Sequence, residues 1–241
     1  MSEPLSFVLA GLAVAFAACV QASVGFAYAL LAAPLLALVQ PSLVPGPVIV
    51  SSFVLSALTA WREHTSIDRP GVATTLLGRL PGSVLAGVAI HWLPAASYEL
   101  LFGGVTLCAV LLSLWTRGVR PTRPNLLVAG FASGLMGTLT SVGGPPIALV
   151  YQNATGPEMR ATLNAYFALG GLVSMAVLGY AGRFGQRELL WGLLLLPAVA
   201  LGFWLSGALR ARLDRRGTRG AVLVLAGVCS AGVMLKALLL R

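Results

Sequence analysis

Two stretches of small and polar residues interrupt long apolar segments, and they hold the side chains best suited to bind a ligand. The candidates in the first stretch are Gln21, Ser23, Gly25 and Tyr28, and those in and after the second are Thr140, Ser141, Gly143, Gly144, Pro145, Gln152 and Asn153. A helix that breaks in mid-membrane frees backbone N–H groups where its second half begins, and the helix dipole is positive there. Glycine keeps that backbone bare, and hydroxyls add donors. Two such breaks meeting near the membrane midplane would form a cage of donors for a small anion.

Arg79 is the one charged residue that lies well inside an apolar segment. It comes eight residues after Gly71, which is about 12 Å along a helix. An arginine at that depth is costly unless it pairs or extends to the interface. Two interpretations stay open: Arg79 reaches the cytoplasmic interface, or it faces a translocation path and attracts an anion. For the two breaks, the alternative is that Gly and Ser only allow close helix packing.

The other ionisable residues do not form a catalytic or metal-binding set. All seven carboxylates fall between apolar segments or within about one turn of a segment end, which argues against a buried proton relay. The two histidines lie away from segment centres, and the three cysteines have no metal-ligand spacing. We therefore expect no enzyme activity, no metal and no cofactor. After Pro157, Arg160 is placed to pair with Glu158, and Asn164 and Tyr166 to line a cavity or bond neighbouring helices.

The composition indicates the environment of these residues. Of 241 residues, 58% are hydrophobic and 10% charged, whereas a soluble domain carries about 25% charged residues. The apolar runs are continuous and not alternating, so they predict membrane-spanning helices and not a barrel. The net charge of +9 comes from basic residues spread between the apolar runs. It therefore indicates orientation in the membrane and not binding to nucleic acid.

Eight apolar segments follow one another, at residues 5–39, 43–61, 71–93, 96–116, 125–153, 161–181, 187–209 and 219–240. The first would be about 52 Å long as one straight helix, far more than the ~30 Å of hydrocarbon. The fifth contains Pro145 and Pro146, which an unbroken helix does not accommodate. The sequence therefore predicts an all-α polytopic membrane protein of eight segments, with segments one and five broken or re-entrant.

Two short matches indicate an internal duplication. Ser-Val-Gly occurs at 23–25 and 141–143, an offset of 118, and Leu-Pro occurs at 80–81 and 196–197, an offset of 116. The predicted organisation is one integral membrane domain made of a first repeat at 1–116, a basic linker at 117–124 and a second repeat at 125–241.

The distribution of basic residues predicts the topology. If segments one and five re-enter, 12 of the 16 basic residues lie on one side of the membrane, and if all eight segments cross, 10 do. The positive-inside rule favours re-entry, with both termini periplasmic. The two halves would then have inverted topology, as in many secondary transporters.

The residues around both breaks resemble the signatures of a known family. Residues 22–36, Ala-Ser-Val-Gly-Phe-Ala-Tyr-Ala-Leu-Leu-Ala-Ala-Pro-Leu-Leu, resemble the first signature of the sulfite exporter TauE/SafE family. Residues 143–149, Gly-Gly-Pro-Pro-Ile-Ala-Leu, followed by Pro157 and Arg160-Ala161-Thr162, are similar to the second. The segment pattern covers nearly the whole chain, although the first break lacks the Gly-Gly often found there. The resemblance implies a multi-pass permease of the bacterial inner membrane for small anions such as sulfite, sulfonates or related organosulfur compounds.

The resulting hypothesis is a secondary transporter for a small anion, embedded in the lipid bilayer. An anion channel with a continuous pore and an integral membrane enzyme that acts on lipid are the alternatives. The identity of the anion, the direction of transport, coupling to H⁺ or Na⁺, and assembly as a homodimer stay open at this point.

Overall fold

The computed structural model of the chain describes residues 3–92, 95–114 and 119–209, with five further positions between 224 and 235. The predicted eighth segment therefore lies almost entirely outside the described residues. Within them the chain forms α-helices, short 3₁₀ turns and loops, without any strand, which confirms the all-α class. Three described helices are long and apolar enough to cross a membrane, Ser6–Val24, Arg69–Trp92 and Gly156–Tyr180, and one bent pair of helices would make a fourth.

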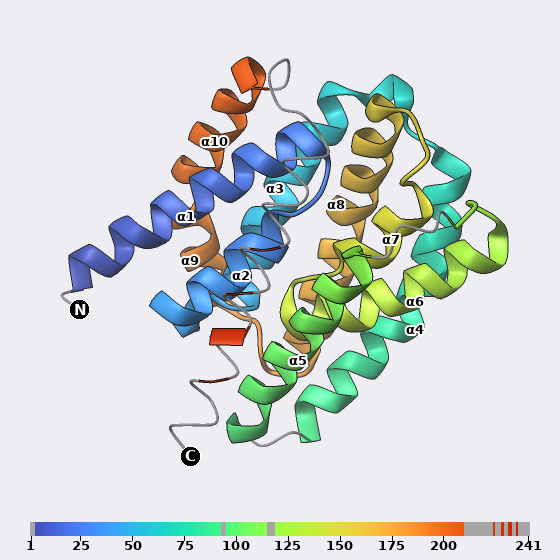
Figure 1. Ribbon diagram of the computed structural model, residues 1–241. Coiled ribbons are helices and arrows are strands. Elements are labelled where there is room, and N and C mark those ends of the chain that lie inside the picture. Colours follow the sequence, from blue (N-terminus) through green and yellow to red (C-terminus); the bar gives the residue numbers. More distant parts are fainter. Residues whose placement is uncertain are drawn as a thin grey trace.

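Segments one and five are both broken at the predicted places. Segment one divides into α1, Glu3–Val24, and α2, Tyr28–Val39, and segment five into α6, Arg123–Thr140, and α7, Gly144–Val150. Helix α2 packs against α1 and runs back along it instead of continuing its direction (Figure 1). The first helices of the two pairs, α1 and α6, end 116 residues apart (140 − 24). The second helices, α2 and α7, begin 116 residues apart (144 − 28). The structural correspondence is thus two residues shorter than the Ser-Val-Gly offset.

The remaining segments agree with the predicted order, with one correction. Helices α3, Gly46–Arg62, α4, Arg69–Trp92, α5, Ala95–Leu114, and α8, Gly156–Tyr180, represent segments two, three, four and six. Short 3₁₀ turns at Pro41–Leu43 and His64–Ser66 precede α3 and α4.

Segment seven was predicted as one element, but it forms α9, Gln186–Leu194, and α10, Leu196–Leu209, bent by 40°. The bend has a physical cause, since Pro197 lacks an N–H and its ring clashes with the carbonyl of Leu193 in a straight helix.

Glycines bring α4 and α6 into backbone contact. A Cβ on Gly78 would lie 2.2 Å from the carbonyl oxygen of Leu127, and a Cβ on Gly130 would lie 2.1 Å from that of Thr75. In lipid, helices associate through close van der Waals packing, and small residues four apart permit it. Gly78 and Gly130 each have a glycine four residues later in their helix. This contact fixes the position of Arg79, which follows Gly78.

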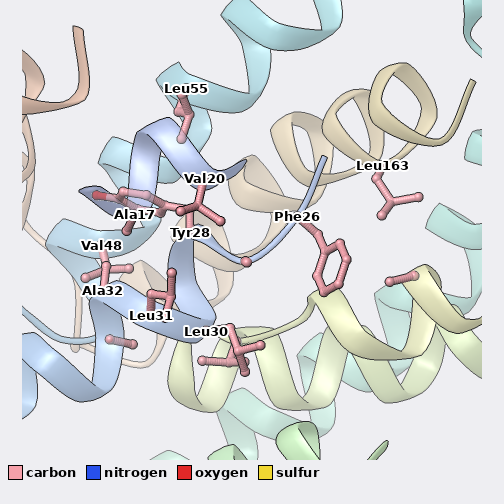
Figure 2. Packing of buried hydrophobic residues seen from close by; sticks show 14 of the residues in the cluster. Ala17, Val20, Phe26, Tyr28, Leu30, Leu31, Ala32, Val48, Leu55 and Leu163 are labelled. Atoms are coloured by element: carbon pink, nitrogen blue, oxygen red, sulfur yellow. The ribbon is translucent and has the colours of Figure 1, made fainter. Parts of the chain in front are cut away.

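The two halves of the chain interleave. Helix α4 packs along α6, α1 along α10, and α3 along α8, so each pair combines one helix from each half (Figure 1). Helices α1, α2 and α3 enclose a core of buried apolar side chains that includes Val20, Tyr28, Leu31 and Val48. Phe26, in the α1–α2 linker, belongs to the same buried cluster and lies apart from Val20 and Leu31 (Figure 2).

Polar contacts join the ends of several helices at one end of the bundle. Arg160, at the start of α8, forms an ion pair with Glu63 in which Nη2 and Oε1 are 3.0 Å apart. The expected partner of Arg160 was Glu158, but residues two apart in a helix point to different faces. Glu63 reaches Arg160 because α3 and α8 pack side by side. Nearby, the Tyr151 hydroxyl donates to Asp68 at 2.7 Å.

Contacts of α9 with α1 and with α3 identify the opposite end of the bundle. Near the start of α1, Phe7 stacks on Trp191 of α9, with ring centroids 5.3 Å apart. The start of α3 lies against α9 as well, since a Cβ on Gly46 would be 2.9 Å from Glu188 Cβ. The first turns of α1, α3 and α9 are therefore at the same end.

Candidate functional site

The two helix breaks meet at one cavity, here called the central cavity, of about 50 Å³. Since about 10–15 Å³ suffices for one water molecule, the cavity has room for a few waters or a small oxyanion. Six of the predicted site residues line it, namely Gln21, Arg79, Ser141, Gly143, Gly144 and Pro145. They come from α1, α4, the second break and the start of α7, elements far apart in sequence that helix packing brings together.

The first break is held by a network of side-chain amides. Gly25 and Ala27 have positive φ values of 108° and 107°, a backbone conformation that is costly for a residue other than glycine. Gln21 Oε1 accepts the N–H of Tyr28 at 3.0 Å, and Asn164 Nδ2 donates to the carbonyl of Gly25 at 2.9 Å. Gln21 Nε2 also donates to Asn164 Oδ1 at 3.0 Å. The network fixes the linker on both sides of Phe26.

The second break uses hydroxyl groups instead. Ser141 adopts a left-handed conformation with φ 64°. The Thr140 hydroxyl accepts the N–H of Val142 at 3.2 Å, and the Ser133 hydroxyl donates to the carbonyl of Gly143 at 2.5 Å. The Pro145–Pro146 pair offers no N–H, so Gly143 and Gly144 supply the bare backbone on this side of the cavity.

Arg79 is the one charged side chain among the described residues that line the central cavity. It is only 4% exposed, so the interpretation that it extends to the interface is wrong. Its Nη1 donates to the Tyr166 hydroxyl at 3.1 Å and its Nη2 to the Ser174 hydroxyl at 2.8 Å. Gly170 makes room for it, because a Cβ there would be 2.6 Å from the guanidinium carbon.

The charge of Arg79 is not neutralised by a carboxylate in the part of the chain that the structure describes. Its hydrogen-bond partners are two neutral hydroxyls, and its Nε–H, which is also buried, has no acceptor. A buried cation costs several kcal/mol, and neutral acceptors offset that only in part. The electrostatics of the central cavity therefore favour an anion.

The other predicted site residues do not line the central cavity. The hydroxyls of Ser23 and Thr140 donate back to carbonyls one turn earlier in their helices, Cys19 and Met136, and the Tyr28 hydroxyl bonds to Ser51. Gly25 lies in the first break but packs against Arg160. Gln152 lies in a neighbouring cavity, and Asn153 is exposed.

Several residues of the site were missed by the sequence analysis. Phe26, Ala27, Gly137, Phe167 and Ser174 line the central cavity but were not selected. On α8 a signal was present, since Tyr166, Gly170 and Ser174 are spaced by four residues and share one helix face. The apolar Phe26 and Phe167 carried no such signal.

Comparison with known proteins identifies the family of the chain. The family model of the sulfite exporter TauE/SafE matches residues 10–233, nearly the whole chain. The chain belongs to the TauE/SafE family. No curated protein and no solved structure matches it. Membership of the TauE/SafE family makes the chain a membrane transport protein, in agreement with its apolar helices.

Proposed function

We propose that this TauE/SafE chain is a secondary transporter that moves a small oxyanion across the bacterial inner membrane. The family description names sulfite, and we propose sulfite, a simple sulfonate or a related organosulfur anion as the substrate class. The observation that carries the proposal is Arg79, a buried cation without a carboxylate partner among the described residues, at the cavity where both helix breaks meet.

The site binds the anion by replacing its hydration shell. Arg79 supplies the opposite charge, and guanidinium groups bind oxyanions through paired N–H donors. The start of α2 lines the cavity through Ala29 and Leu30, and first-turn amides of a helix have no partner within the helix. Bare backbone at Gly143 and Gly144 completes the enclosure. The low dielectric of the surroundings strengthens each of these interactions.

Two inverted repeats provide the mechanism of alternating access. The shared offset of 116 residues at both breaks supports a duplication. The packing of α4 on α6 and of α1 on α10 supports it too, because each pair joins the third segment of one repeat to the first segment of the other. We propose the boundaries 1–116, 117–124 and 125–241 for the first repeat, linker and second repeat. One repeat rocks against the other around the central cavity.

The contacts at the two ends of the bundle support the re-entrant topology. If all eight segments crossed, Arg160 and Glu63 would lie on opposite sides of the membrane, as would Gly46 and Glu188, yet both pairs are in contact. In the re-entrant topology each pair shares a side. The positive-inside rule makes the end with Arg160 cytoplasmic and both termini periplasmic.

Cysteine labelling in intact cells tests this topology. In a variant without native cysteines, Gln186→Cys should react with a membrane-impermeant thiol reagent, and Thr65→Cys should react only after permeabilisation. Both positions are exposed in the structure, so burial does not explain a difference between them. Equal labelling of the two positions in intact cells would contradict the topology.

Transport by purified protein in liposomes tests the function itself. Sulfite and methanesulfonate are added under imposed H⁺ or Na⁺ gradients, and empty liposomes serve as the control. The proposal requires saturable flux of at least one anion that responds to one of the gradients. Flux that does not saturate would indicate a channel, and turnover of lipid without anion flux would indicate a membrane enzyme.

A further inference from the structure

A second cavity adjoins the central cavity. This side cavity has a volume of about 260 Å³ and is lined mainly by apolar residues of α5, α7 and the start of α8. Phe26 and Pro145 line both cavities. They are therefore the groups that separate the anion site from the larger space beside it.

The side cavity extends toward the end of the bundle that carries the Arg160–Glu63 ion pair. Its lining includes Ala154, Gly156 and Met159, which lie in the α7–α8 linker and the first turn of α8, just before Arg160. None of the described lining residues is charged. Ser113 and Gln152 are the polar residues in this otherwise apolar lining.

Phe26 is the part of this partition that can move. Pro145 is fixed at the start of α7 by its ring. Phe26 instead lies in a three-residue linker between two residues with positive φ, Gly25 and Ala27. Backbone in this region persists only when its surroundings hold it, and here the Gln21–Asn164 pair bonds the backbone on both sides of Phe26.

We propose that Phe26 is the gate between the anion site and the cytoplasmic end of the transporter, a step that rests on the proposed function. The side cavity is the passage from the gate to that end. The ring of Phe26, 5% exposed, closes the passage in this structure, and the Gln21–Asn164 pair holds it closed. Movement of the linker displaces the ring and joins the two cavities.

Thiol accessibility from the cytoplasmic side tests the gate without requiring transport. In a variant without native cysteines, Ser52→Cys places a thiol at the central cavity and Ser113→Cys places one at the side cavity. An impermeant thiol reagent is applied to inside-out vesicles. Phe26→Ala should speed labelling of Ser52→Cys about tenfold or more, as expected if the open population rises by an order of magnitude, and leave Ser113→Cys unchanged.

Phe167→Ala is the matched control. It removes an aromatic ring that lines only the central cavity, so it should not speed labelling of Ser52→Cys. Asn164→Ala is a second test variant: it removes the bond to Gly25 and should speed labelling of Ser52→Cys while Phe26 is intact. The gate can therefore be tested even if Phe26→Ala does not fold. Unchanged Ser52→Cys labelling in folded Phe26→Ala or Asn164→Ala, with Ser113→Cys reactive, would overturn the gate. Anion flux in liposomes, measured separately, shows whether the proposed function itself has failed.

Discussion

Replacing Arg79 with glutamine should weaken anion binding and transport strongly while the protein still folds. Arg79 supplies the one charge among the described residues that line the central cavity. Hydrogen bonds to charged groups contribute about 1.5–3 kcal/mol, so the loss should reduce affinity about 10- to 150-fold. Glutamine retains an amide that can bond to Tyr166 or Ser174, and Arg79→Lys should restore binding only in part because it lacks the planar fork.

Thermal stability separates this account from a structural role for Arg79. An uncompensated buried cation destabilises the fold, so Arg79→Gln should unfold at the same temperature as the wild type or a higher one. Binding of sulfite and thermal unfolding are measured on the same purified sample. Wild-type affinity in Arg79→Gln would remove Arg79 from the anion site, and a large loss of stability would indicate that its role is packing.

Valine at Gly25 or Gly143 should abolish transport, although the two positions lie in different halves of the chain. Gly25 has φ 108°, and a Cβ there would be 2.8 Å from Arg160 Cγ. A Cβ on Gly143 would be 2.7 Å from the carbonyl oxygen of Ser133. Each substitution distorts one of the two breaks that form the central cavity. Anion binding to monodisperse protein in detergent is the measurement, since wild-type affinity in both variants would show that the breaks are only structural.

Alanine at Gly144 separates the anion site from packing. A Cβ on Gly144 has no neighbour closer than 3.6 Å, so the protein should fold normally, yet the added methyl group enters the small central cavity. We expect unchanged thermal stability and weaker anion binding. Gly11→Ala, at a position with no atom within 4 Å, is the matched control and should change neither. Equal affinity in the two variants would contradict the placement of the anion beside Gly144.

The helix breaks could be predicted because their causes are local. An unbroken helix does not accommodate two adjacent prolines in its interior, and glycine readily adopts the positive φ found at Gly25. The structure breaks segments one and five beside those residues. The burial of Arg79 depends on α8, which provides Tyr166, Ser174 and the space beside Gly170. These contacts join residues more than 80 positions apart, and no periodicity within one segment encodes them.

The hydroxyls of the breaks show why composition alone overestimates a site. Ser23 and Thr140 were selected as donors to a ligand, but each bonds to a carbonyl of its own helix. Any serine or threonine in a helix can form this bond to the carbonyl one turn earlier, so the sequence does not show which hydroxyls form it. Gln21 was selected as well and lines the central cavity, yet its amide holds the linker beside Phe26. Only the three-dimensional structure separates the side chains that line the cavity from those that hold the backbone of the breaks.

Locating the anion in the protein tests the central claim most directly. Selenite has the shape and charge of sulfite, and selenium can be located by its anomalous scattering in crystals grown at saturating selenite. We predict one strong selenium peak within hydrogen-bonding reach of the Arg79 guanidinium, between Gly144 and the start of α2. A dominant peak elsewhere in the chain, or no peak at concentrations that saturate binding in solution, would contradict the account.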